Sequence, residues 1–265
     1  MKYTISSLSF DWGKAKKLAA MPADLGYEIF WECGSRDTWI NTMDLINAEQ
    51  KHPFSIHSPY FFVDLSLPGD TDKMFEELKR PFDIYHRYGG EFYVVHTFDH
   101  MTYPQDDAFE ADCRKRSIER LGKFNEICKE NGVQMVAENI AFGGDERYLF
   151  NQDQFLEIFR QLPELNCLID LGHAALADMN VYEMQQELKG RIKAYHIHDN
   201  NGKGDQHQRI HTGIRDWDLF AKGVAEFTPD AVGVMEYMNC PELSIYLEDR
   251  ATLEALIAKK QEALL

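Results

Sequence analysis

The chain has 265 residues, in which 28 lysines and arginines face 44 aspartates and glutamates, so the formal net charge is −16. Non-specific binding of nucleic acids is mostly electrostatic, and this charge repels a phosphate backbone, so we expect no nucleic-acid partner. The 44% hydrophobic content suffices for a large core and excludes general disorder. No segment approaches the ~20 apolar residues of a membrane-spanning helix, so no membrane partner is expected.

Cysteine usage and the absence of linkers indicate a single cytoplasmic domain. The five cysteines form no C-x-x-C pair, which is typical of reduced thiols. The first ten residues contain one lysine and no long apolar stretch, so no secretory signal is expected. Because no Gly/Ser-rich or Pro-rich tract divides the chain, we expect one domain over residues 1–265.

Short apolar runs rich in β-formers alternate along the chain with amphipathic segments. The predicted strands are Tyr3–Phe10, Tyr27–Glu32, Phe54–His57, Phe92–Thr97, Val133–Glu138, Cys167–Asp170, Ile192–His198 and Ala231–Glu236. The predicted helices are Asp72–Tyr88, Ala108–Asn131, Gln154–Gln161, Tyr182–Lys189, Trp217–Phe227 and Pro241–Leu265. This alternation predicts an α/β protein with parallel strands, whose natural closed form is a (β/α)₈ TIM barrel. An open doubly wound sheet is the alternative, although no G-x-G-x-x-G turn follows the first strand.

The third to the eighth predicted strands all end in a histidine or a carboxylate. These residues are His57, His96, Glu138, Asp170, the pair His196 and His198, and Glu236. In a barrel the C-terminal strand ends converge on one face, where active sites lie. Each residue alone is well explained as a hydrogen-bonded rim residue, but six successive strands with such ends predict a shared site. A buried carboxylate there must be paired or bound to a metal.

Further candidate ligands lie in the loops. His173 follows Asp170 by three residues, across a bend that Gly172 permits. Asp205 and His207 lie two apart in the polar segment after the seventh strand. Imidazole and carboxylate groups together are ligands of zinc, manganese and cobalt. A helix cap is the alternative for His173, and a solvated loop is the alternative for the other two.

Four motifs resemble one known superfamily: A-E-N at 137–139, I-D-L-G-H at 169–173, H-I-H-D-N-N-G-K-G-D-Q-H at 196–207 and G-I-R-D-W at 213–217. Over nearly its whole length the chain resembles the xylose isomerase-like barrels, namely the sugar phosphate isomerases and epimerases and the related endonuclease IV group. The epimerase branch implies one divalent cation, held by Glu138, Asp170, either His196 or His198, and Glu236. The endonuclease IV branch implies three zinc ions, held by His57, His96, Glu138, Asp170, His173, His196, Asp205, His207 and Glu236.

The resemblance, together with the charge, favours a metal-dependent isomerase or epimerase of a small keto-sugar or sugar phosphate, with Mn²⁺, Zn²⁺ or Co²⁺ as cofactor. It implies proton transfer through an enediolate, with Glu138 and Glu236 as base and acid. An endonuclease IV-like phosphodiesterase acting on abasic DNA, and a sugar lyase or dehydratase, are the alternatives. The sugar, the number of ions and the oligomeric state stay open.

The resemblance also implies a set of substrate contacts. His173 is expected to orient a substrate oxygen, with Asn139 supporting it. The chain departs from the family at 208–212, where an apolar L-x-L-G is more common, and we expect Arg209 and His211 to contact the substrate there. Aromatic residues of the strand-end loops are expected to form an apolar wall or to pack, namely Tyr60, Phe61 and Tyr103.

Overall fold

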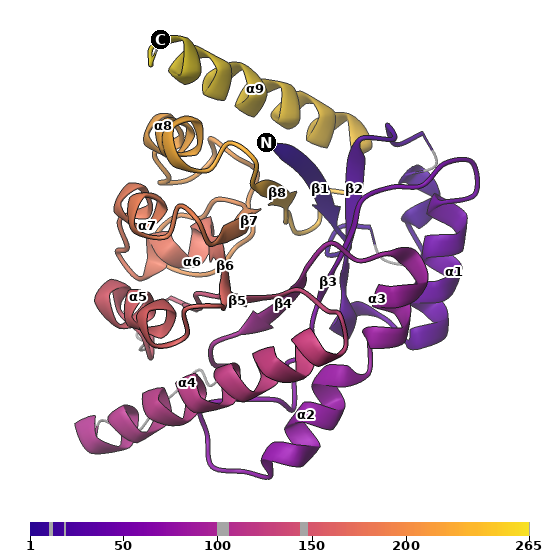
Figure 1. Ribbon diagram of the computed structural model, residues 1–265. Coiled ribbons are helices and arrows are strands. Elements are labelled where there is room, and N and C mark those ends of the chain that lie inside the picture. Colours follow the sequence, from indigo (N-terminus) through magenta and orange to yellow (C-terminus); the bar gives the residue numbers. More distant parts are fainter. Residues whose placement is uncertain (11–12, 19, 100–105, 144–147, 265) are drawn as a thin grey trace.

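The computed structural model describes residues 1–10, 13–18, 20–99, 106–143 and 148–264. In this part of the chain eight parallel strands pair in sequence order, and β8 pairs with β1 to close a barrel (Figure 1). The strands are β1 Lys2–Ser6, β2 Leu25–Phe30, β3 Phe54–His57, β4 Tyr93–His96, β5 Met135–Glu138, β6 Asn166–Asp170, β7 Ile192–Ile197 and β8 Val232–Met235. The predicted (β/α)₈ barrel is confirmed.

Helices surround the strands, and the last helix passes beside β1, where the chain begins (Figure 1). The α-helices in the described ranges are α1 Arg36–Ile46, α2 Thr71–Lys79, α3 Phe82–Tyr88, α4 Asp107–Glu130, α5 Gln152–Gln161, α6 Leu171–Leu176, α7 Val181–Glu187, α8 Trp217–Phe227 and α9 Leu243–Glu262. Two 3₁₀ helices, η1 Ala15–Leu18 and η2 Trp31–Cys33, lie beside β2 in the sequence. Seven of the α-helices begin after a side chain that accepts a first-turn backbone N–H, as N-caps do; these caps are Ser35, Asp70, Asp106, Asn151, Asp170, Asn180 and Asp216. No described helix is both long enough and apolar enough to cross a membrane.

The main differences from the sequence-based expectation concern the first strand and three helical regions. The first strand ends at Ser6 and not at Phe10, because the chain turns there: the Ser7 hydroxyl accepts from the backbone N–H of Phe30, and that of Ser9 donates to the carbonyl of Tyr237. The predicted helix 72–88 is two helices, α2 and α3, separated around Pro81, whose missing N–H and fixed ring interrupt helical bonding. Helices α1 and α6 were not predicted.

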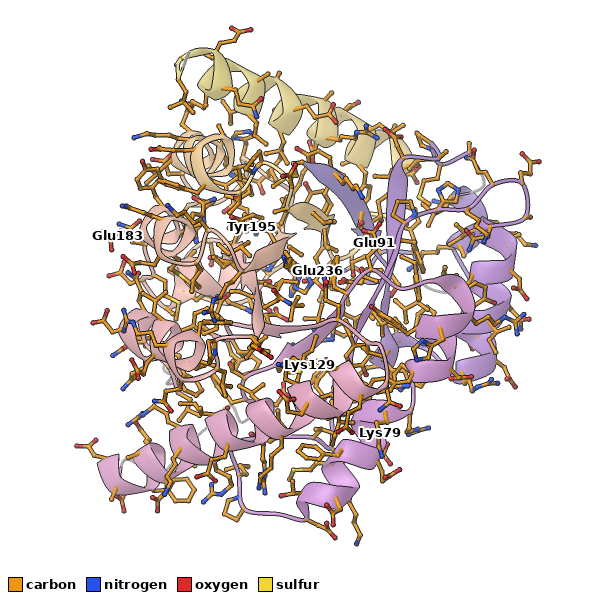
Figure 2. All side chains as sticks on the ribbon, in the orientation of Figure 1. Lys79, Glu91, Lys129, Glu183, Tyr195 and Glu236 are labelled. Carbon is orange, nitrogen blue, oxygen red and sulfur yellow. The ribbon has the colours of Figure 1, made fainter. Side chains whose placement is uncertain are left out.

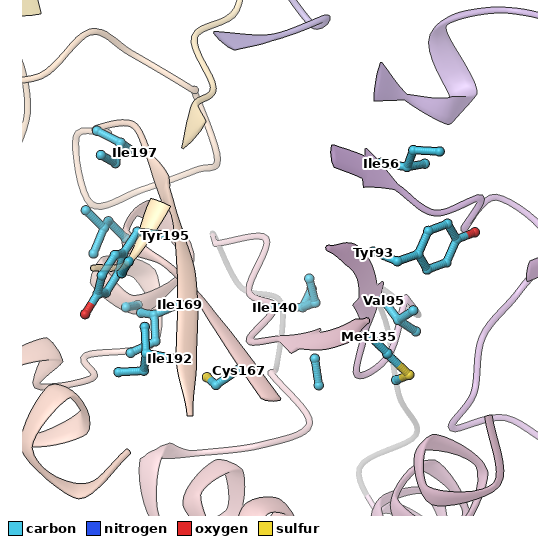
Figure 3. Packing of buried hydrophobic residues seen from close by; sticks show 14 of the residues in the cluster. Ile56, Tyr93, Val95, Met135, Ile140, Cys167, Ile169, Ile192, Tyr195 and Ile197 are labelled. Atoms are coloured by element: carbon cyan, nitrogen blue, oxygen red, sulfur yellow. The ribbon is translucent and has the colours of Figure 1, made fainter. Parts of the chain in front are cut away.

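The core has two layers, because successive side chains of a strand point to opposite faces. The outward faces pack against the helices: Tyr93 donates to the carbonyl of Leu78, and the Tyr195 hydroxyl bonds to Thr228. In Figure 3 these two tyrosines point in opposite directions, away from the space between the strands. The inward faces form a separate small apolar cluster, made of Phe92, Val94, Val136, Leu168, Ala194, Val232 and Val234. This cluster fills the barrel below the site.

Candidate metal centre

The candidate site lies one layer above the apolar cluster inside the barrel. The topmost apolar residues of five strands are Val94, Val136, Leu168, Ala194 and Val234. Two positions further along the same strands lie, in the same order, His96, Glu138, Asp170, His196 and Glu236. A spacing of two keeps each polar side chain on the inward face, and parallel strands bring them to one end of the barrel. Glu236 accordingly lies near the centre of the molecule in Figure 2.

His196 lies at the centre of four carboxylates. Its Nδ1 lies 3.1 Å from Oε1 of Glu138, 3.2 Å from Oε2 of Glu236 and 3.6 Å from Oδ2 of Asp170. Its Nε2 lies 3.1 Å from Oε1 of Glu28. All five side chains are almost completely buried. One ring nitrogen carries at most one proton and cannot satisfy three carboxylates, so this group needs further positive charge.

A second group lies beside the first, at the ends of β3 and β4. The Nε2 atoms of His57 and His96 lie 2.9 Å apart, and each lies 3.5 Å from Oε2 of Glu138. That carboxylate oxygen is buried and has no hydrogen-bond partner among the described residues. Nδ1 of His57 donates to the carbonyl of Ser58 at 3.1 Å, and Nδ1 of His96 lies 2.7 Å from a carboxylate oxygen of Asp99. Both histidines therefore turn their remaining nitrogen toward Glu138.

The third group joins α6 to the loop after β7. Nδ1 of His173 donates to the carbonyl of Asn139, and Nδ1 of His207 donates to the carbonyl of Glu236, each at 2.9 Å. Their Nε2 atoms lie 3.3 and 2.9 Å from Oδ2 of Asp205. The other oxygen of Asp205 is buried without a partner in the described ranges. The solvated-loop alternative for this pair is therefore wrong.

His198 completes the cluster without belonging to the third group. Its Nε2 lies 2.9 Å from Oδ2 of Asp170, which also caps α6 by accepting from the backbone N–H of His173 at 2.6 Å. The ring of His198 stacks on His207, with centroids 4.0 Å apart and planes at 16°. In-plane lone pairs of nearly parallel rings do not converge on one ion. A Cβ at Gly172 would lie 2.0 Å from Cε1 of His198, so only glycine fits there.

The structure brings every predicted ligand into one continuous network at the barrel mouth. Five sets of three residues in this network each place one ligand atom per residue within 4.8 Å of the others. They are Glu138–Asp170–His196, His57–His96–Glu138, His173–Asp205–His207, His198–His207–Glu236 and Glu28–His196–Glu236. The anchoring of one ring nitrogen by an oxygen, with the other nitrogen facing carboxylates, is the arrangement that orients metal-binding histidines. The buried oxygens that lack partners fit the same reading, because a cation would satisfy them.

Three predicted substrate contacts have other partners in the structure. The amide of Asn139 bonds to the backbone of Asp170 through both of its ends, at 2.8 and 3.0 Å, which matches a supporting role but leaves no end free for substrate. Arg209 binds Asp249 of α9 through Nε at 2.9 Å to both carboxylate oxygens. His211 lines an outer hollow with residues of α8 and α9. Arg209 thus ties the β7–α8 loop to α9, and the ring of His211 lies 5.7 Å from that of Trp217 on α8; the substrate contacts expected of both residues stay predictions.

Burial and charge act on these groups in opposite directions. Burial raises the pKa of Glu236. Burial also opposes ionisation of Glu138, but the charges of His196 and His96 outweigh it and hold the pKa of Glu138 well below its usual range. Burial disfavours a charged His207, yet Asp205 outweighs it and raises the pKa of His207 to about 9. Without metal, protons on such histidines balance the carboxylates; a bound cation would replace them.

Two buried acids were not predicted as part of the site. Glu28 lies in the middle of β2 within L-G-Y-E-I-F, and Asp99 lies in the loop after β4. Each bonds to the far nitrogen of a predicted ligand, His196 and His96 respectively. For Glu28 the available signal was a charged residue inside an otherwise apolar strand, which a barrel buries only with a partner.

Of the aromatic residues expected to form a wall or to pack, Tyr60 lies beside the cluster. The ring of Tyr60 lies 5.8 Å from His57 and 5.0 Å from His96 between centroids, beside the second group. Its backbone N–H and that of Phe61 donate to Glu32. Phe61 itself is 63% exposed and does not line the described cluster. Tyr103 lies outside the described residues.

Fold and site together define a class: a (β/α)₈ barrel with a buried histidine–carboxylate centre at the C-terminal ends of its strands, typical of metal-dependent barrel enzymes. Within that class the chain belongs to the xylose isomerase-like TIM barrel family, whose model matches residues 25–256. An uncharacterized protein of Methanocaldococcus jannaschii is 33% identical over 123 residues, 46% of either chain. The chain thus matches under half the length of this curated relative.

Solved structures share the fold over the full chain. A D-tagatose 3-epimerase-like protein superimposes with a TM-score of 0.83 at 20% identity and covers 100% of both chains. The IolI protein with a bound zinc atom superimposes with a TM-score of 0.77 at 16% identity, and the match covers 98% of this chain and 99% of that one. Identities this low show likeness of fold only.

Proposed function

We propose that this protein is a divalent-metal-dependent isomerase or epimerase of a small keto-sugar or sugar phosphate. The observation that carries the proposal is the approach of Glu138 and Glu236, from β5 and the end of β8, to the same nitrogen of His196. Their pKa values are moved in opposite directions, which is how one site provides a base and an acid. The family and the epimerase-like neighbour agree with this reading.

The reaction removes a proton from a carbon next to a carbonyl and returns a proton to the substrate. Glu138, held ionised by neighbouring imidazoles, is suited to accept the proton. Glu236, whose pKa is raised by burial, is suited to deliver one. The carboxylates lie in a buried layer, which limits exchange of the transferred proton with water.

Glu138, Asp170, Glu236 and Nδ1 of His196 would hold the metal. A donor set of three carboxylates and one imidazole suits Mn²⁺, Co²⁺ or Zn²⁺. When bound, the cation would stabilise negative charge that develops on the substrate oxygen. His173 is proposed as a ligand and not as a substrate contact, because its Nδ1 is fixed on the carbonyl of Asn139 and its Nε2 faces Asp205, with which it could share an ion.

The direct test is solvent exchange. Protein loaded with Mn²⁺ and incubated in D₂O with a panel of ketoses and ketose phosphates should introduce deuterium beside the carbonyl of at least one of them. Glu138→Gln and Glu236→Gln should abolish the exchange and retain the fold, as judged by circular dichroism. Exchange at the wild-type rate in both variants would contradict the assignment of base and acid.

A metal-dependent phosphodiesterase is a second candidate, because the second and third groups repeat the ligand chemistry of the first. Several ions at such spacing clamp both the attacking and the leaving oxygen of a phosphodiester. Two features argue against a DNA substrate. The first is the net charge of −16. The second is that Arg209, in the loop after β7, is neutralised by Glu248 and Asp249 of α9. Cleavage of an abasic duplex at low salt, without deuterium uptake by any sugar, would favour this second function.

A further inference from the structure

We propose that Glu28 is a positioning residue, which accepts a hydrogen bond from Nε2 of His196 and so leaves Nδ1, the nitrogen that faces the three carboxylates of the centre, to bind a cation. The inference rests on the proposed function, in which that nitrogen is a metal ligand. Glu28 and His196 are both completely buried, so water does not compete for their contact. Oε1 of Glu28 lies 3.1 Å from Nε2 of His196. An ionised carboxylate only accepts, so this contact requires a proton on Nε2. Nδ1 lies equally close, at 3.1 Å, to Oε1 of Glu138, so it carries a proton there until a cation replaces that proton.

Four other histidines of the centre follow the same rule. His57, His173 and His207 each donate from Nδ1 to a backbone carbonyl, and His96 places Nδ1 beside the carboxylate of Asp99. In each of these four the other nitrogen faces the cluster. His196 follows the rule with its nitrogens exchanged, because the oxygen at its outer side lies beside Nε2 and belongs to a carboxylate. Glu28 supplies that oxygen.

Glu28 is itself held in place by its neighbours in the sheet. Its Cα pairs in register with Ser55 on β3 and with Ser6 on β1. Ser55 donates to Oε2 of Glu28 at 2.7 Å, so the two carboxylate oxygens have separate partners. The small serines leave room for the longer glutamate inside the barrel. The result is a hydrogen-bonded chain from Ser55 through Glu28 to Nε2 of His196, on the side of the ring opposite Nδ1, which faces the proposed metal ligands.

This arrangement argues against Glu28 as a metal ligand in its own right. It approaches the ring nitrogen that faces away from Glu138 and Asp170, and its other oxygen is engaged by Ser55. An ion bound at Nε2 would therefore be out of reach of Glu138 and Asp170, which an ion bound at Nδ1 could use as ligands. Outer partners of this kind commonly change metal affinity by about 10–100-fold when they are replaced.

The test reads the hydrogen bond from Nε2 of His196 directly. In metal-free protein with ¹⁵N-labelled histidine, the wild type should show a slowly exchanging Nε2–H of His196 with its proton signal shifted downfield. The signals are assigned by their loss in His196→Gln. Glu28→Ala and Glu28→Asp should lose this protected signal, because the first removes the acceptor and the second withdraws it. Glu28→Gln should keep it in part, since its carbonyl oxygen can accept from Nε2.

Metal affinity gives a second, independent measurement. Titration of Mn²⁺ into chelator-treated protein should show about 100-fold weaker binding in Glu28→Ala and Glu28→Asp, and about 10-fold weaker binding in Glu28→Gln. Ser55→Ala should show a smaller loss. Asp249→Asn changes a buried carboxylate far along the chain on α9 and serves as the matched control, with wild-type affinity expected even if stability falls.

The outcomes separate the inference from the function on which it rests. The absence of a protected Nε2–H in the wild type, or an unchanged Nε2–H signal in Glu28→Ala, would overturn the positioning role. Wild-type Mn²⁺ affinity in Glu28→Asp, with strong loss in Glu28→Gln, would also overturn it, because charge and not hydrogen-bond geometry would then be what matters. If the wild type binds no Mn²⁺ at all, the proposed function fails, while the Nε2–H measurement still decides the role of Glu28.

Discussion

Replacing Gly172 by alanine should break the contact between α6 and β7 that supports the centre. The added Cβ would lie 2.0 Å from Cε1, 2.4 Å from Nδ1 and 2.8 Å from Nε2 of His198. Ordinary contacts of a Cβ begin at 3.4 Å, so the imidazole or the helix must move by more than 1 Å. That movement breaks the 2.9 Å contact between His198 and Asp170.

The expected cost follows from two terms. Overpacking of a rigid site costs about 1–3 kcal/mol, and loss of a hydrogen bond to a charged group costs about 1.5–3 kcal/mol. The gain in helix propensity of at most about 1 kcal/mol does not offset them. We therefore expect Gly172→Ala to lower the free energy of unfolding by about 3 kcal/mol, measured by urea denaturation, and to weaken Mn²⁺ binding.

Gly190→Ala is the matched control for this change. Gly190 is exposed, and an added Cβ there would meet no heavy atom of the described chain within 4 Å. We expect it to be neutral or to stabilise by about 0.4–1 kcal/mol. Equal midpoints for Gly172→Ala and the wild type, with unchanged Mn²⁺ affinity, would refute the packing argument.

Three further predictions concern stability. In metal-free protein the raised pKa of His207 means that its protonated form contributes stability below pH 6.5, which is lost as the pH rises to about 9. Between pH 6.5 and about 9, the unfolding free energy of the wild type should fall by about 3 kcal/mol more than that of His207→Gln. Equal falls in the two proteins would contradict this role of His207. Arg209→Ala leaves the buried Asp249 unpaired and should lower the free energy of unfolding by about 2 kcal/mol without changing Mn²⁺ affinity. A change in substrate KM with unchanged stability would instead show that Arg209 contacts the substrate. Asn139→Ala removes two hydrogen bonds to the backbone of Asp170, so it should lower the free energy of unfolding by about 2 kcal/mol and weaken Mn²⁺ binding. Unchanged stability and unchanged Mn²⁺ affinity would exclude the supporting role of Asn139.

The barrel and the ends of its strands could be predicted because both depend on local pattern. An apolar run that stops at Glu138 or Asp170 marks the end of a strand, and parallel topology then gathers such ends at one face. The split between α2 and α3 also had a local signal in Pro81. Helix α1 was missed although it had local signals too: Ser35 caps it, and Trp39, Thr42, Met43 and Ile46 bury one stripe.

The partners of the site residues could not be predicted in the same way. Glu28 reaches His196 across 168 positions of sequence, and no spacing in either segment encodes that contact. Arg209 looked available in the sequence because its partner Asp249 lies 40 residues later on another helix. Local pattern thus places residues on elements, whereas the closure of the barrel decides which of them meet.

The most direct test of the central claim is a crystal of the protein soaked in MnCl₂, with data collected for anomalous scattering from manganese. We predict a peak about 2.0–2.3 Å from Nδ1 of His196 and from a carboxylate oxygen of each of Glu138, Asp170 and Glu236. We further predict that Nε2 of His196 stays bonded to Glu28 in the same crystal. A well-ordered centre without such a peak, or manganese bound only at exposed carboxylates, would contradict the account.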